Sequence, residues 1–302
     1  YILTNDEISK MVDTTDEWIM GRIGIKERRI LKEEGLGTSY IARKAVKQLI
    51  KRTHTNPDDI DLIIVATTTP DYRFPSTASI LCERLGLKRA FAFDIQAVCS
   101  GFLYALETGA NFIRSGNYKK VVVVGAEKMS SIINYTDRAT CPIFGDGGAA
   151  VMLEPTTEDL GIMDAVLRTD GKGLPFLHIK AGGSVCTTSY YSLDNQMHYI
   201  YQEGRTFYIR TGCIMVKHKG TSLSVTHLFA AHFIERINGL QIEIVDFGKI
   251  HFSGHDLAGF YAGFAAVFRQ DFFNGVHNTS PFVFSNYNIF TWVLQLHRHP
   301  AP

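Results

Sequence analysis

The 302-residue sequence has few cysteines, few prolines and no excess of either charge. Its five cysteines (82, 99, 141, 186 and 213) are scattered and form no CxxC pair, which suits a reducing cytoplasm better than a disulfide scaffold. Thirty-one Lys and Arg residues face 30 Asp and Glu residues, a net charge of +1. That balance argues against a general binder of nucleic acid or of anionic membranes.

Long hydrophobic runs are also missing. No apolar run reaches the roughly 18 residues that suggest a membrane-spanning helix, and the best candidate, residues 282–296, is broken by Ser285, Asn286 and Asn288. No basic segment followed by an apolar stretch indicates a signal peptide. Apolar residues make up 45% of the chain, enough for a sizeable core. We therefore expect a cytoplasmic globular protein of roughly two domain-equivalents, with no membrane or nucleic-acid partner.

Strand-like and helix-like segments alternate over the first two hundred residues. Residues 61–67 and 120–125 are short runs rich in β-branched residues, typical of strands covered on both faces, and residues 90–95 and 149–153 are two further predicted strands. Residues 38–51 repeat apolar side chains at helical spacing. Strands that alternate with helices predict an α/β fold.

Composition changes near residue 208. Of the first 208 residues 49 are charged, whereas only 12 of the last 94 are, and those 94 hold 8 of the 11 histidines. One interpretation is a buried C-terminal half. The other, which we favour, is a segment foreign to the rest of the chain, as a change of reading frame would produce.

Cys99 has the most informative chemical surroundings. It follows the strand predicted at 90–95 and precedes a helix predicted at 100–114. A cysteine at a helix N-terminus meets unpaired backbone N–H groups and the positive end of the helix dipole, which favour the thiolate. Gly101 leaves room for a substrate carbonyl. A free cysteine is more often a buried small hydrophobic residue, so both interpretations, nucleophile and core residue, stay open on spacing alone.

The run FAFDIQAVCSGF, residues 91–102, resembles the active-site segment of the 3-oxoacyl-[acyl-carrier-protein] synthase III family, condensing enzymes of the thiolase superfamily. Other segments resemble the same family, in family order, up to about residue 206; they are residues 13–19, 24–30, 67–77, 125–127, 136–138, 144–148 and 182–184. Such a series is more specific than any single motif.

The resemblance implies a five-layered αβαβα thiolase-like fold, built from two similar α/β halves and normally a cytosolic homodimer. We assign residues 1–155 to the N-terminal half, which carries the nucleophile. Residues 156–302 form the C-terminal half, which departs from the family after about residue 208.

The resemblance also implies binding residues for acyl-coenzyme A. Trp18 and Arg138 match the pair that sandwiches the adenine, Arg22 a position that meets the phosphates, and Thr14 one that hydrogen-bonds the nucleotide. Phe74 matches the residue that crosses the dimer interface to close the partner's acyl pocket. Taken singly, each has a plainer alternative: a core anchor for Trp18, solvated charges for the arginines, and ordinary core for Phe74.

The implied activity is that of a beta-ketoacyl-ACP synthase III. Cys99 takes an acyl group from acyl-CoA, and decarboxylative condensation with malonyl-ACP gives 3-oxoacyl-ACP, which initiates type II fatty acid biosynthesis. Acyl-CoA and malonyl-ACP are substrates and no cofactor is implied. Hydroxymethylglutaryl-CoA synthases and plant-type polyketide synthases are alternatives within the class. A non-catalytic, truncated or frame-shifted homologue that at most binds acyl-CoA is the alternative outside it, and a cysteine peptidase has little support.

The family also uses a His in a Pro-His-Gln-Ala-Asn motif and an Asn in a Gly-Asn-Thr motif, and neither motif is recognisable here. His232 and Asn278 are the remaining candidates, to which we assign no role. His251 and His255 form an i, i+4 pair without an accompanying carboxylate, so no metal site is expected.

Overall fold

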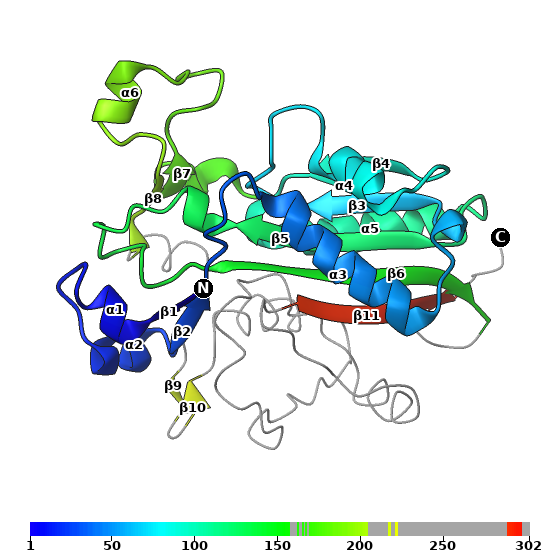
Figure 1. Ribbon diagram of the computed structural model, residues 1–302, viewed down its shortest axis with the longest axis horizontal. Helices are drawn as coiled ribbons and strands as arrows, with labels where there is room; N and C mark the ends of the chain where they lie inside the picture. Colours follow the sequence, from blue (N-terminus) through cyan, green and yellow to red (C-terminus); the bar gives the residue numbers. More distant parts are fainter. Residues whose placement is uncertain are drawn as a thin grey trace. The chain divides into compact units, whose positions relative to one another are not determined.

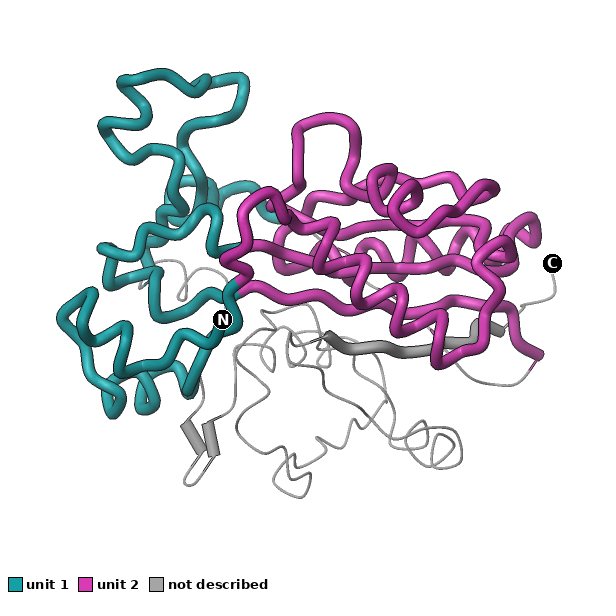
Figure 2. The backbone as a smooth tube through the Cα atoms, viewed as in Figure 1, with its two compact units in different colours: residues 1–30, 129–145, 168–259 teal, residues 31–128, 146–167, 260–302 magenta. Residues whose placement is uncertain are grey.

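The structure is a computed structural model. It describes residues 1–157, 162, 165, 167 and 169–204, together with the backbone of residues 217–218, 221–222 and 289–297. The chain divides into two compact units (Figure 2). Unit 1 comprises residues 1–30, 129–145 and 168–259, and unit 2 comprises residues 31–128, 146–167 and 260–302.

Unit 2 is built on a five-stranded sheet in the order β11-β6-β5-β3-β4 (Figure 1). β3 pairs in parallel with β4 and β5, β6 pairs antiparallel to β5, and β11 pairs in parallel with β6. The strands are β3 (Leu62–Ala66), β4 (Phe91–Ile95), β5 (Val121–Lys128), β6 (Asp146–Thr156) and β11 (Ile289–His297). Every strand predicted from the sequence is present.

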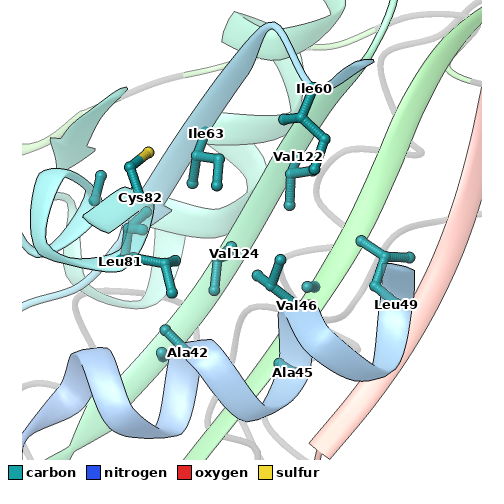
Figure 3. Packing of buried hydrophobic residues seen from close by; sticks show 14 of the residues in the cluster. Ala42, Ala45, Val46, Leu49, Ile60, Ile63, Leu81, Cys82, Val122 and Val124 are labelled. Carbon is teal, nitrogen blue, oxygen red and sulfur yellow. The ribbon is translucent and has the colours of Figure 1, made fainter. Parts of the chain in front are cut away.

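Helices cover both faces of this sheet. Successive residues of β3 and β5 point to opposite faces: Ile63 and Val122 join a cluster with α3 and α4 (Figure 3), whereas Leu62 and Val121 pack with α5. The helical elements of this unit are α3 (Thr38–Thr53), α4 (Thr77–Leu85), α5 (Gly101–Arg114) and the 3-10 turns η1 (Pro57–Asp59) and η2 (Val98–Ser100).

The described part of unit 1 has two short two-stranded antiparallel sheets and several short helices. Its strand pairs are β1 (Ile2–Thr4) with β2 (Glu27–Arg29), and β7 (Leu177–Ile179) with β8 (Ile200–Gln202). The helical elements are α1 (Asn5–Ile8), α2 (Asp16–Arg22), α6 (Tyr190–Asp194), η3 (Met129–Ser131) and η4 (Gly171–Gly173). A two-stranded pair, β9 (Lys217–His218) with β10 (Thr221–Ser222), also belongs to its residue range.

A buried arginine ties the segment 129–145 to the N-terminal two-stranded sheet of unit 1. Arg28 is fully buried, and its Nε donates to the carbonyl of Pro142 at 3.0 Å. Its Nη1 donates to the side-chain oxygen of Asn5. Because a buried guanidinium must find acceptors, these two segments are held together by its hydrogen bonds.

The predicted α/β class is confirmed. The division at residue 155 stays a prediction, because most of the C-terminal half lies outside the described residues. In the described part of the chain, no helix combines the length and apolar character needed to cross a membrane.

Candidate active site and coenzyme-binding residues

Cys99 lies on the turn that joins β4 to α5. β4 ends at Ile95, Cys99 is the middle residue of η2, and α5 begins at Gly101. The residue before it, Val98, has φ = 47°, in the left-handed region that a β-branched side chain rarely adopts. The surrounding structure therefore imposes this turn, and it leaves Cys99 exposed at the start of a 14-residue helix.

The first turn of α5 lies close against the end of β3 and the middle of β5. A Cβ at Gly125 of β5 would come within 3.1 Å of the Phe102 ring. A Cβ at Gly101 would lie 3.4 Å from the Cβ of Ala66, the last residue of β3. These close approaches fix the N-terminal end of α5, and with it the turn that carries Cys99.

The other described cysteines are in different surroundings. Burial raises the pKa of Cys82 to about 11 and is the largest cause that raises the pKa of Cys141 to about 11. Both are therefore neutral thiols at physiological pH. Cys186 is partly exposed, and Cys99 is exposed. The interpretation of Cys99 as a buried core residue is thus wrong, whereas its role as nucleophile stays a prediction.

A partly buried carboxylate organises the end of β3. Glu127, near the end of β5, accepts hydrogen bonds from Thr68 N at 2.7 Å, Thr69 N at 3.0 Å and Thr67 Oγ1 at 3.1 Å, and also from the Thr69 hydroxyl. Desolvation raises the pKa of Glu127 despite these hydrogen bonds, which act to lower it. Thr67 and Glu127 each lie in a segment that resembles the family, but no feature of the sequence pairs the two segments.

Phe74 lies on the loop between β3 and α4. Its side chain is 86% exposed in the single chain, and Tyr72 on the same loop is 65% exposed. The alternative that Phe74 is an ordinary core residue is therefore wrong. An exposed aromatic pair on one loop is a surface suited to contact with a partner.

Unit 1 brings three predicted coenzyme-binding residues together. The guanidinium carbon of Arg138 lies 4.3 Å from the centroid of the Trp18 ring, and that of Arg22, one turn along α2, lies 5.9 Å from it. Thr14, just before α2, is 9% exposed, and its hydroxyl oxygen is buried without a hydrogen-bond partner among the described residues. Two cations beside one indole are suited to a ligand that is aromatic and anionic.

Arg138 is held on a turn built by polar side chains on either side of it. Asn134 Oδ1 accepts from Thr136 N at 2.9 Å. Asp137 accepts from Ala139 N at 2.9 Å and from the Thr140 hydroxyl at 2.6 Å. These local hydrogen bonds fix the backbone at Arg138.

The predicted site residues are divided between the two units, and some of the candidates lie outside the described residues. Cys99 and Phe74 belong to unit 2, whereas Thr14, Trp18, Arg22 and Arg138 belong to unit 1. His232, Asn278, His251 and His255 lie outside the described residues. Among the residues that the structure describes, no group of three or more His, Cys, Asp or Glu side chains could hold a metal ion.

Comparison with known proteins matches the first part of the chain. The family model of 3-oxoacyl-[acyl-carrier-protein (ACP)] synthase III matches residues 93–171. A beta-ketoacyl-[acyl-carrier-protein] synthase III of Bacteroides thetaiotaomicron is 84% identical over 208 residues, which cover 69% of this chain and 62% of the relative. The enzyme of the same name from Porphyromonas gingivalis W83 is 53% identical over 207 residues, 68% of this chain and 62% of the relative.

Solved structures give the same result. A crystal structure of 3-oxoacyl-[acyl-carrier-protein] synthase III from Aquifex aeolicus has a TM-score of 0.61 at 42% identity and covers 69% of this chain and 62% of that one. This chain thus matches a little over three-fifths of the length of its relatives. Over the two-thirds of its own length that they match, the chain is similar to members of the beta-ketoacyl-[acyl-carrier-protein] synthase III family.

Proposed function

We propose that this protein is a beta-ketoacyl-ACP synthase III that initiates type II fatty acid biosynthesis. The observation that carries the proposal is the placement of Cys99, exposed on a strained turn at the start of α5, within the segment that the family model matches. Relatives that are named as synthases at 84% and 77% identity favour this function over the non-catalytic alternative.

In the first half-reaction the Cys99 thiolate attacks the thioester carbonyl of acyl-CoA. A new C–S bond forms, the bond to the coenzyme sulfur breaks, and coenzyme A leaves as a thiolate that takes up a proton. The exposed start of α5 supports this step, since the helix dipole favours the attacking thiolate. In the second half-reaction malonyl-ACP loses carbon dioxide, and the resulting carbanion attacks the acyl group held on Cys99. A C–C bond forms, the bond between the acyl carbon and the Cys99 sulfur breaks, and 3-oxoacyl-ACP is released together with the Cys99 thiolate. Neither half-reaction needs a cofactor, because each starts from an activated thioester.

In this proposal Trp18 and Arg138 hold the adenine of the coenzyme, Arg22 its phosphates, and Thr14 a polar group of the nucleotide. The 4.3 Å contact between Trp18 and Arg138 leaves no room for a base between them, because two stacked contacts at van der Waals distance need about 7 to 8 Å. Binding of the adenine must therefore move Arg138 away from the indole.

We also propose a cytoplasmic homodimer. β4 is the last strand on its side of the described sheet. Four of its five residues are apolar, and Phe91 at its start is 39% exposed. An edge strand of this kind is a template for pairing with another strand. Phe74, 86% exposed, supports the same partner, a second copy of the chain whose acyl pocket it would close. The acyl carrier protein is the other proposed partner.

A condensation assay tests the whole proposal. The full chain is incubated with acetyl-CoA and malonyl-ACP, and 3-oxoacyl-ACP is measured by mass spectrometry, with Cys99→Ala as the test variant and Cys186→Ala as the matched control. Product from the wild type and the control, but not from Cys99→Ala, supports the proposal. Acylation of Cys99 without any condensation product would contradict it and support the non-catalytic alternative.

A further inference from the structure

The side chain of Asp94 connects the strand that leads to Cys99 with the helix that follows the Phe74 loop. Asp94 lies in β4, five residues before Cys99. Its Oδ2 accepts from Thr77 N at 2.7 Å, and its Oδ1 accepts from Ala78 N at 2.8 Å. Thr77 and Ala78 are the first two residues of α4.

These two hydrogen bonds complete the N-terminal cap of α4. The first N–H groups of a helix have no acceptor within the helix. Asp94 supplies acceptors for the first two, and the Ser76 hydroxyl accepts from Ser79 N at 3.1 Å. A carboxylate at the positive end of a helix makes charge-assisted hydrogen bonds, which are stronger than neutral ones. α4 is therefore fixed to β4 at its first turn.

The opposite end of the loop is fixed independently. Asp71 accepts hydrogen bonds from Ser39 N at 2.7 Å and from the Ser39 hydroxyl. It also lies close to Gly37, where an added Cβ would come within 2.6 Å of the Asp71 Oδ1. The Thr38 hydroxyl donates to the carbonyl of Thr69. Both ends of the loop are thus held by α3 and β4, while its middle is exposed.

We propose that Asp94 is a positioning residue that sets the location of Phe74 relative to the strand delivering Cys99, and thereby selects the length of the acyl group. This inference rests on the proposed function, in which Phe74 closes the partner's acyl pocket. Asp94 does not touch the substrate in this account. It acts through α4, so its loss changes which acyl chain is accepted and leaves the reactivity of the Cys99 thiol unchanged.

Asp94→Asn tests the inference, with Asp61→Asn as the matched control. The asparagine keeps one acceptor oxygen but places an NH2 group against the second backbone N–H, so one hydrogen bond is lost. Asp61 also accepts two backbone N–H groups, Lys119 N at 2.7 Å and Lys120 N at 3.0 Å, but at the start of β3 and β5, away from the turn that carries Cys99. Three rates are measured on the full chain: amide exchange at the start of α4, alkylation of Cys99 by iodoacetamide, and acylation of Cys99 by hexanoyl-CoA relative to acetyl-CoA.

In Asp94→Asn we expect amide exchange at Thr77 and Ala78 to be about tenfold faster, as expected for the loss of one charge-assisted hydrogen bond. The hexanoyl-to-acetyl ratio should rise by a similar factor, with alkylation of Cys99 unchanged. Asp61→Asn should leave all three as in the wild type.

Two results would overturn the inference. Unchanged exchange in Asp94→Asn would show that the carboxylate does not hold α4. Faster amide exchange with an unchanged hexanoyl-to-acetyl ratio would show that Asp94 supports α4 but takes no part in the selection of the acyl group. If neither acyl-CoA modifies wild-type Cys99, the proposed function fails and the selection role fails with it, while the exchange rates still report whether Asp94 caps α4.

Discussion

Arg138 lies directly over the ring of Trp18, with its guanidinium carbon 4.3 Å from the ring centroid. The two residues are 120 positions apart in the sequence, on a polar turn and on α2 respectively. The pair is formed without a ligand, so part of any binding energy for an aromatic base is spent on separating it.

We expect Trp18 fluorescence to change on addition of coenzyme A, because adenine must displace Arg138 from the indole. Trp18 is one of two tryptophans, so the titration is done in a Trp292→Phe background. Arg138→Ala should weaken binding about tenfold, the size of one desolvated cation–π contact. Arg43→Ala removes an arginine of α3 and serves as the control. Equal affinities for Arg138→Ala and Arg43→Ala would contradict the assignment of Arg138.

Alkylation should distinguish the cysteines. At neutral pH and limiting iodoacetamide, we expect the Cys99 peptide to be modified first, because its thiol is exposed at a helix N-terminus. Cys82 and Cys141 should react only on unfolding, since burial raises the pKa of each to about 11. Peptide mass spectrometry over time measures the order. Modification of Cys82 or Cys141 before Cys99 in the folded protein would contradict the description of the turn.

Glu127 gives a prediction on pH. Desolvation raises its pKa in the folded protein, so the folded state holds this proton more tightly than the unfolded state. The contribution of this group to the free energy of unfolding is therefore largest below its ordinary pKa of about 4.3 and falls as pH rises toward the folded value.

Thermal unfolding of the wild type and Glu127→Gln between pH 4 and 8 measures this effect. The Tm of the wild type minus that of Glu127→Gln should decrease as pH rises, since glutamine does not titrate. Glu83→Gln, on the exposed side of α4, controls for the loss of a charge. A difference that grows with pH would show that the hydrogen bonds from the threonines outweigh desolvation.

Arg28 gives a prediction on stability. Arg28→Met should lower the free energy of unfolding by about 3 kcal/mol, because it leaves the Pro142 carbonyl and the Asn5 side chain buried without this donor. Arg43→Met removes an exposed hydrogen bond to the Arg84 carbonyl and should cost much less. Urea unfolding of both variants makes the comparison, and equal losses would mean that Arg28 does not hold its two segments together.

The strands of unit 2 could be predicted because they are buried on both faces and therefore apolar throughout. β6 is longer than predicted, 146–156 against 149–153. Its first residues, Asp146 to Gly148, carry no strand signal, and it is their antiparallel pairing with the end of β5 that extends it. Pairing of this kind depends on the order of strands in the sheet, which local sequence does not encode.

The contacts at the site that the sequence did not predict also depend on the pairing of segments far apart in the chain. Cys99 was placed correctly because the strand, the turn and the helix follow one another along the chain. The hydrogen bonds of Glu127 to Thr67 and of Asp94 to Thr77 span 60 and 17 positions. They depend on which strand ends meet at one edge of the sheet. Only the structure brings these residues together.

The most direct test of the central claim is peptide-level mass spectrometry of the full chain after incubation with acetyl-CoA. The account predicts one acetyl group, confined to the peptide that contains Cys99, in the wild type and in Cys186→Ala, and none in Cys99→Ala. An acetyl group on another cysteine, or none on a protein whose circular dichroism and melting show it to be folded, would contradict the assignment of Cys99 as the nucleophile.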